Sequence, residues 1–208
     1  MEDISSWQEK FEVCVYAKKL LDKVEYLNTK VKNPVDIEEV KKGIYYARKY
    51  HGSQMRQSGD PYYSHPIEVA IMVAEFTAYK EAKFFTTDTI ITSLLHDTIE
   101  DTNLNKETIA IIFDLEIARQ VEALTRIKPH KKITSAEMLK LLYYNLEKKL
   151  LIIKLFDRFH NIQTLKVKTP EKAKKKIDET LEEFLILAEY LKLPYIAQET
   201  AKLCKMYY

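Results

Sequence analysis

Apolar residues recur at three- and four-residue steps along most of the chain, the spacing that places side chains on one face of an α-helix. Between Trp7 and Leu27 this spacing predicts a first helix. Asp36 is a helix-capping residue with Glu39 three positions later, so a second helix is predicted to begin there and to end near His51.

Turn and capping residues predict where the later helices begin. After a turn at residues 58–61, Pro66 lies in the first turn of a predicted helix, so His65 is expected at its entrance. A capping residue within 86–88 begins the helix that leads into His96-Asp97. Further helices are predicted over residues 105–113, 115–126, 135–147, 149–165 and 170–191, and a last one follows Pro194.

The composition favours the same fold class. Only three glycines occur in 208 residues, which favours helices over turn-rich β structure. We therefore predict an all-α bundle of about nine or ten helices without a significant β-sheet. Glycine-rich loops that cradle phosphate are absent from the sequence, which argues against the Rossmann and P-loop classes.

Charge and cysteine usage exclude several further classes of function. The chain carries 33 basic and 31 acidic side chains, so no nucleic-acid partner is expected; a lysine cluster at residues 166–176 is interpreted as a solvated helix face. No apolar run approaches the roughly 18 to 20 residues that span a bilayer, and no signal peptide follows Met1. We expect a cytoplasmic protein without a membrane partner. Cys14 and Cys204 form no C-x-x-C motif, and the oligomeric state stays open.

One imidazole and three carboxylates lie within six positions at the end of a predicted apolar helix. These residues are His96, Asp97, Glu100 and Asp101. Burying several carboxylates is unfavourable unless a cation or hydrogen bonds compensate, and a divalent metal ion is the simplest compensation. Adjacent His and Asp side chains project about 100° apart on a helix, so further ligands are expected from elsewhere in the chain.

Two other segments offer such ligands. His65 is expected at a helix entrance, and the predicted helix 149–165 carries a polar stripe in an otherwise apolar sequence. Because they are three or four residues apart, the members of this stripe share one helix face: Lys154, Asp157, Asn161 and Thr164. The stripe indicates a cavity in which an acidic metal ligand is flanked by groups that bind phosphate oxygens and sugar hydroxyls.

His65, His96-Asp97 and Asp157 resemble the H…HD…D signature of the HD phosphohydrolase superfamily, whose members bind a divalent metal with these residues. Four longer motifs resemble, in the same order, the hydrolase domain of the RelA/SpoT homologues, which destroys the nucleotide alarmone ppGpp. The motifs are Arg48-x-x-His51-x-x-Gln54, Arg56-x-Ser58-Gly59-x-Pro61-Tyr62-x-x-His65-Pro66, His96-Asp97-x-x-Glu100-Asp101-Thr102 and Lys154-x-x-Asp157-Arg158-x-His160-Asn161-x-x-Thr164. The resemblance runs from about residue 36 to 203, and we expect an N-terminal helical extension over 1–33 and an HD-type domain over 34–208.

The resemblance implies a ligand set, a catalytic pair and a substrate site. One Mn²⁺ per chain would be held by His65, His96, Asp97 and Asp157. The catalytic acidic pair would be Glu100 and Asp101. The substrate-binding residues would be Arg56, Ser58, Tyr62, Lys154, Asn161 and Thr164. The implied reaction is hydrolysis of the 3′-pyrophosphate of ppGpp or pppGpp to GDP or GTP and pyrophosphate.

Two departures from the family pattern bear on these expectations. Gln57 replaces a Lys of the family, which removes a positive charge near a highly anionic substrate. Phe156 and Phe159 replace Ala and Leu on either side of Asp157, and we expect them to repack the wall without abolishing the site. His51 is interpreted as a structural or helix-capping residue and His160 as a supporting residue rather than a metal ligand.

Alternative functions and metals stay open. The same pocket would also suit another nucleotide, such as NADPH with its 2′-phosphate, or a non-catalytic regulator that binds alarmone. Two imidazoles and two carboxylates accommodate Mn²⁺, Fe²⁺, Co²⁺ or Zn²⁺. The short sequence after Pro194 leaves no room for the synthetase domain of the long relatives, so a single-domain hydrolase similar to the animal members is expected.

Overall fold

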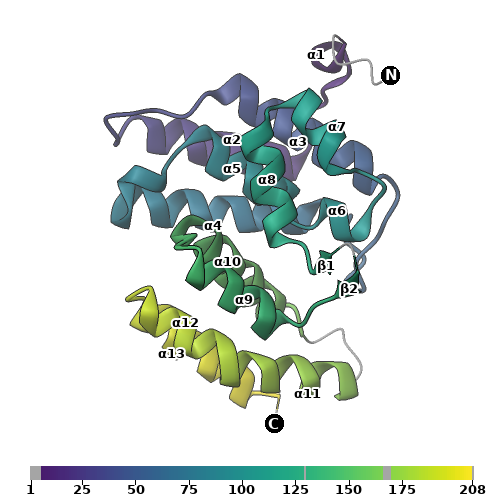
Figure 1. Ribbon diagram of the computed structural model, residues 1–208. Helices are drawn as coiled ribbons and strands as arrows, with labels where there is room; N and C mark the ends of the chain where they lie inside the picture. The colour runs from purple at the N-terminus through teal and green to yellow at the C-terminus, as the bar shows by residue number, and fades with distance from the viewer. Residues whose placement is uncertain (1–5, 129, 166–169, 208) are drawn as a thin grey trace.

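The computed structural model describes residues 6–128, 130–165 and 170–207, and within them the protein is almost entirely helical (Figure 1). The first half contains α1 Trp7–Lys10, α2 Val15–Asn28, α3 Ile37–His51, α4 Ser64–Lys80, α5 Thr87–Leu95, α6 Thr98–Asp101, α7 Lys106–Ile112 and α8 Leu115–Leu124. The second half contains α9 Ser135–Tyr144, α10 Lys148–Gln163, α11 Pro170–Glu179, α12 Leu185–Tyr190 and α13 Pro194–Lys205. The predicted all-α class is confirmed.

Short elements connect some of these helices. A 3₁₀ turn, Ala82–Phe84, lies between α4 and α5, and a π-helical turn, Thr180–Phe184, joins α11 to α12. Within the described residues the one β-ladder is a hairpin of two antiparallel two-residue strands, β1 Ile127–Lys128 and β2 Lys131–Lys132. This hairpin was not predicted, and it is too small to change the fold class.

Capping residues fix several helix boundaries where the sequence predicts them. Asp36 Oδ1 accepts hydrogen bonds from the backbone N–H groups of Glu38 and Glu39, so α3 begins at Ile37. Gly52 ends the same helix with a φ of 52°, a left-handed conformation that glycine adopts without steric cost. The Thr86 side chain caps α5, the helix that leads to His96.

The predicted continuous helix from Trp7 to Leu27 is wrong. The chain leaves helical geometry at Phe11, which has φ −74° and ψ 118°, and α2 restarts after Cys14, whose side chain accepts from Ala17 N. Trp7 packs into a core that includes residues of α7 and α8, whereas α2 packs into a separate core with α3, α4 and α5. Packing against two different cores therefore overrides the continuous periodicity.

Helix α4 lies at the centre of the bundle and packs against α2, α5 and α10. In Figure 1 the N-terminal helices form the upper part of the molecule, α9 and α10 lie below them, and α11 to α13 form the lower edge. Helices α3 and α5 approach closely at Gly43, where a Cβ atom would lie 2.9 Å from Leu94 Cδ1. This contact fixes α5 against α3 and so positions the end of α5, which carries His96.

The first helices belong to the same packed structure as the rest of the chain. Leu20, Val24 and Leu27 of α2 are fully buried in a core shared with α3 and α4. The expected boundary between residues 33 and 34 stays a prediction. No helix among the described residues combines the length and apolarity needed to cross a bilayer.

Candidate active site

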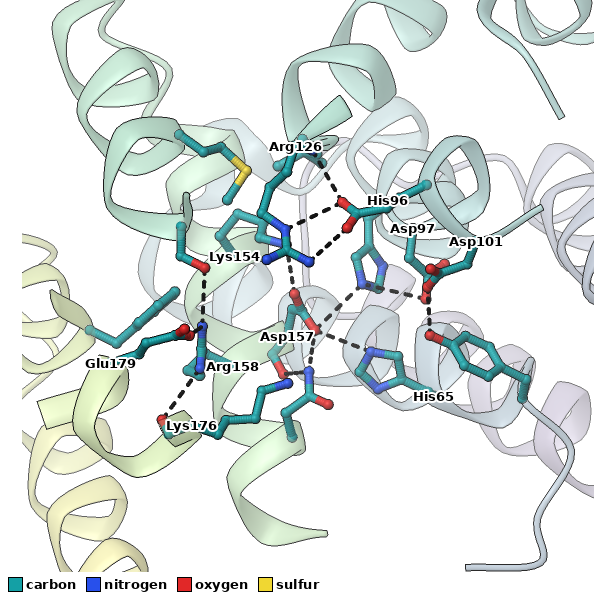
Figure 2. Close-up of a pocket in the computed structure, with 17 residues that line it drawn as sticks. His65, His96, Asp97, Asp101, Arg126, Lys154, Asp157, Arg158, Lys176 and Glu179 are labelled. Atoms are coloured by element: carbon teal, nitrogen blue, oxygen red, sulfur yellow. Dashed lines mark hydrogen bonds and ion pairs between the residues drawn. The ribbon is translucent and has the colours of Figure 1, made fainter. Parts of the chain in front are cut away.

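A polar cavity of about 230 Å³ opens where α4, α5, α6 and α10 meet, and α11 with its π-helical turn lies along another side (Figure 2). Its lining brings together groups that are far apart in the sequence. Among them are His65, His96, Asp97, Glu100, Asp101 and Asp157, six residues that the sequence singled out. Figure 2 shows the two imidazoles and the Asp157 carboxylate pointing toward one another.

Three side chains place possible metal-ligand atoms within 4.8 Å of one another: His65, His96 and Asp157. His65 is the second residue of α4, His96 follows the last residue of α5, and Asp157 lies in the middle of α10. Asp157 Oδ1 lies 3.1 Å from His65 Nε2 and 3.6 Å from His96 Nε2. The start of α4, the end of α5 and the middle of α10 thus converge on one point.

Asp97 lies beside this group without belonging to it. Its Oδ2 atom is 3.9 Å from His96 Nε2, and this buried oxygen has no hydrogen-bond partner among the described residues. Its Oδ1 atom is 3.2 Å from His51 Nε2. A buried carboxylate oxygen without a partner is costly, so Asp97 presents an unused acceptor toward the cluster.

The donor set fits a single divalent cation. When two ligand atoms each lie about 2.1 to 2.2 Å from an ion and the ligand–ion–ligand angle is about 90°, the two atoms are roughly 3 Å apart. The Asp157 oxygen and the His65 nitrogen have a similar spacing, 3.1 Å. His96 Nδ1 lies 2.8 Å from the Ser93 carbonyl oxygen, which only accepts, so Nδ1 carries a proton and Nε2 is the ring nitrogen left to bind a cation.

His160 contacts the Nδ1 atom of His65, as the Ser93 carbonyl oxygen contacts that of His96. The two Nδ1 atoms are 2.7 Å apart, so one ring must donate to the other. Burial, together with the electrostatic effects of His65 and Arg56, lowers the pKa of His160 to about 3, so its ring stays neutral. When His65 donates from Nδ1 to His160, its Nε2 atom is free to bind a cation beside Asp157. This placement agrees with the interpretation of His160 as a supporting residue.

Neighbouring cations keep the two aspartates ionised. Burial alone would raise the pKa of Asp97, but the charges and hydrogen bonding of His96 and His51 outweigh it and hold the pKa well below its usual range. Burial would also raise the pKa of Asp157, but Lys154 and His96 outweigh it and hold this pKa well below its usual range. Both carboxylates are therefore anionic and available to a cation across the neutral pH range.

His51 is more closely connected to the site than its interpretation as a cap suggested. Gln54 Nε2 donates to the Asp101 carbonyl oxygen at 2.8 Å, so its Oε1 atom faces His51 Nδ1 at 2.9 Å. Nδ1 donates to this oxygen, and Nε2 faces Asp97. Burial lowers the pKa of His51, but the hydrogen bond and charge of Asp97 outweigh it and raise the pKa above its ordinary value.

Glu100 and Asp101, on α6, have different surroundings. The Glu100 carboxylate receives Arg126 NH2 at 2.6 Å and Lys132 Nζ at 2.8 Å. Burial raises its pKa, but these two cations outweigh that effect and lower the pKa to about 2. Asp101 Oδ2 instead accepts a hydrogen bond from Tyr62 OH at 2.8 Å. Glu100 is thus a fixed anion, whereas Asp101 faces the cavity with a neutral partner.

The low pKa of Glu100 predicts a specific loss of stability in acid. Its folded-state pKa of about 2 lies below the ordinary 4.5, so its contribution is fully present above pH 4.5 and is lost as the pH falls toward 2. We expect Glu100→Gln to flatten the decrease in the unfolding free energy of the metal-free protein over that interval. Urea unfolding of both proteins at several pH values measures this; parallel pH curves would contradict it.

The six predicted substrate residues divide into two groups. Tyr62, Lys154 and Asn161 line the cavity, and the last two also contact Asp157, with Lys154 Nζ and Asn161 Nδ2 each 2.7 Å from a carboxylate oxygen. The other three residues do not line it: Arg56, Ser58 and Thr164. Arg56 donates to Thr164 Oγ1 at 3.0 Å and Ser58 to Asp60 at 2.8 Å, and their predicted contacts with substrate stay predictions.

Several cavity residues were missed or given another interpretation. Arg126 follows α8 in a loop that carries no motif, so only the fold places it beside Glu100. Arg158 is buried, donates to Glu179 Oε2 at 3.1 Å and lies 4.3 Å from the centre of the Phe184 ring. Lys176, interpreted as part of a solvated face, lines the cavity. In the same cluster Lys166 and Lys168 lie outside the described residues.

The two phenylalanines beside Asp157 do not form the cavity wall as expected. Phe156 is buried and packs against Phe76, with ring centroids 5.6 Å apart. Phe159 packs against the same hydrophobic core. On a helix, residues one or two positions from Asp157 point away from its face. These substitutions therefore change the core behind α10 and not the lining of the cavity.

Comparison with known proteins gives a consistent result. The profile of a family described as "HD domain" matches residues 43–192. A "GTP pyrophosphokinase rsh" of Brucella ovis is 38% identical over 180 residues, 83% of this chain and 23% of that protein. A "Guanosine-3′,5′-bis(diphosphate) 3′-pyrophosphohydrolase" of Aquifex aeolicus is 37% identical over 161 residues, 76% of this chain and 22% of that protein. The chain thus spans about a quarter of the length of these curated relatives.

A solved structure supports the fold. It is described as a metazoan ortholog of SpoT that hydrolyzes ppGpp, and it matches with a TM-score of 0.60 at 22% sequence identity. The match covers 77% of this chain and 94% of the other. At this level of identity the similarity concerns the arrangement of the helices.

Proposed function

The chain belongs to the HD-domain family, and we propose that within this family it is a metal-dependent (p)ppGpp 3′-pyrophosphohydrolase. The observation that carries the proposal is the convergence of His65, His96 and Asp157, with Asp97 beside them, in a cavity that also holds an acidic pair and several cations. Relatives named for this reaction or for the GTP pyrophosphokinase reaction support the nucleotide class.

We propose that His65, His96, Asp97 and Asp157 hold one Mn²⁺. The mixed imidazole and carboxylate set suits Mn²⁺, and the unpartnered Asp97 Oδ2 fits a ligand role. When bound, the ion would supply Lewis acidity that activates water and polarises a phosphoryl oxygen. The donors themselves are already held in place, because His160 and the Ser93 carbonyl oxygen fix the two imidazole rings.

The remaining cavity residues have complementary roles in hydrolysis. Asp101 accepts a proton from the attacking water, whose oxygen bonds to phosphorus while the bond to the ribose 3′ oxygen breaks. The 3′ oxygen takes up the proton that Asp101 received and leaves as the hydroxyl of GDP or GTP, and the attacked group leaves as pyrophosphate. Lys154, Arg126 and Lys176 line the cavity and would offset the negative charge of the phosphates. Tyr62 holds the Asp101 carboxylate toward the cavity.

The proposal is tested by incubating the purified protein with ppGpp and Mn²⁺ and separating the nucleotides by chromatography. We expect GDP and pyrophosphate to appear in equal amounts, and no turnover after chelation of the metal. Tight binding of ppGpp without product would contradict hydrolysis and favour a regulator. Release of orthophosphate from NADPH, with ppGpp untouched, would favour the alternative nucleotide. The cytoplasmic location expected from the sequence belongs to this proposal, since guanine nucleotides are made and used there.

A further inference from the structure

A hydrogen-bonded chain links Asp97 to Asp101 through buried His51 and exposed Gln54, two residues outside the catalytic and ligand sets. His51 Nε2 lies 3.2 Å from Asp97 Oδ1, and His51 Nδ1 lies 2.9 Å from Gln54 Oε1. Gln54 Nε2 then donates to the Asp101 carbonyl oxygen at 2.8 Å. The chain therefore begins at the aspartate next to His96 and ends at the backbone of the residue proposed to accept a proton.

Tyr62 also connects His51 with Asp101. It stacks on the His51 ring with centroids 4.7 Å apart and an angle of 25° between the planes. Its hydroxyl donates to Asp101 Oδ2 at 2.8 Å. Asp101 is thus held twice, at its backbone by Gln54 and at its carboxylate by Tyr62, and both of these residues contact His51.

Backbone hydrogen bonds hold His51, Gln54 and Tyr62 close together. His51 is the last residue of α3 and its side chain is fully buried. Gln54 N donates to the His51 carbonyl oxygen, and Tyr62 N donates to the Gln54 carbonyl oxygen, each at 2.9 Å. The loop between α3 and α4 is therefore closed at its base, which brings Gln54 and Tyr62 back to the end of α3.

We propose that His51 and Gln54 are positioning residues that fix the two aspartates of the α6 turn relative to the imidazole ligands. His51 holds Asp97 Oδ1, so the carboxylate turns its other oxygen, the buried and unpartnered Oδ2, toward the cluster. Gln54 holds the backbone carbonyl group of Asp101, and this backbone position determines where the Asp101 side chain enters the cavity. This inference rests on the proposed function, but it concerns the order of the site before any substrate binds.

The test measures Mn²⁺ affinity of the full chain by electron paramagnetic resonance of free Mn²⁺, without nucleotide. His51→Phe keeps a ring to stack on Tyr62 and removes both hydrogen bonds. We expect it to raise the Kd for Mn²⁺ by about 10- to 100-fold, the range found when a residue that orients a metal ligand is replaced. Gln57→Met, an exposed change in the same loop, is the matched control and leaves the Kd unchanged.

Gln54→Met provides a second, independent arm at an exposed position. It keeps the His51 contact with Asp97 and removes the contact with Asp101, so we expect a small change in Mn²⁺ Kd and a fall of about 10-fold or more in kcat at saturating Mn²⁺. If both residues act as one chain, the effects of His51→Phe and Gln54→Met on kcat are not additive in the double variant.

The inference is overturned if folded His51→Phe binds Mn²⁺ as tightly as the wild type. If His51→Phe does not fold, an unchanged kcat in Gln54→Met overturns it. When the wild type binds Mn²⁺ but hydrolyses no ppGpp, the proposed function fails, and the His51→Phe affinity still decides whether the positioning role is correct.

Discussion

Asp157→Asn is expected to lower the rate of ppGpp hydrolysis by about a thousand-fold. The Asp157 carboxylate contacts both imidazoles of the cluster, at 3.1 and 3.6 Å. The asparagine has the same shape but no charge, so the site loses affinity for the cation that would supply the Lewis acidity. A loss of roughly 4 kcal/mol of transition-state stabilisation corresponds to this factor, at about 1.4 kcal/mol for each tenfold.

The effect is measured as kcat/KM by chromatography of the reaction products, with the Mn²⁺ content of each protein determined in parallel. Asp22→Asn is the matched control, because Asp22 lies on the exposed face of α2 and pairs only with exposed Lys18. It should retain wild-type activity and metal content. Full activity in Asp157→Asn would rule out the proposed centre.

Asp101→Asn is expected to lower kcat by about 100- to 10,000-fold, the usual contribution of a general base, while Mn²⁺ affinity stays within about threefold. The substitution preserves the acceptor for Tyr62 OH and the backbone contact with Gln54, so the cavity keeps its shape. Only the ability to take a proton is lost. A kcat defect without a metal defect is therefore the signature that separates this residue from the four ligands.

Glu107→Gln tests whether removal of an acid outside the cavity lining has the same effect. Glu107 is an exposed residue in the first turn of α7, and its replacement should leave kcat unchanged. Two results for Asp101→Asn would contradict the assignment. One is an unchanged kcat, and the other is a loss of Mn²⁺ binding as large as that caused by Asp157→Asn.

The sequence predicted best those features that depend on local rules. The cap at Asp36, the end of α3 at Gly52 and the entrance of α4 at His65 follow from residues a few positions apart, and the structure agrees with all three. The polar stripe of α10 was also visible, because helical spacing alone puts Lys154, Asp157 and Asn161 on one face. The resemblance then linked this stripe to His96, which spacing alone could not do.

Features that depend on tertiary packing were not predicted. The break between α1 and α2 arises because Trp7 and α2 bury themselves in different cores, and no residue between them is a helix breaker. The pairing of Arg126 with Glu100 depends on how the chain turns after α8 into the hairpin. His51 was interpreted from its position at a helix end, which says nothing about the distant carboxylate of Asp97 that its ring contacts.

Diffraction data collected at the manganese absorption edge from crystals grown with Mn²⁺ test the central claim most directly. We expect one anomalous peak per chain, within about 2 to 2.5 Å of His65 Nε2, His96 Nε2 and one carboxylate oxygen each of Asp97 and Asp157. A peak that lies elsewhere, or a peak at the cluster that Asp97 or His65 does not contact, would contradict it.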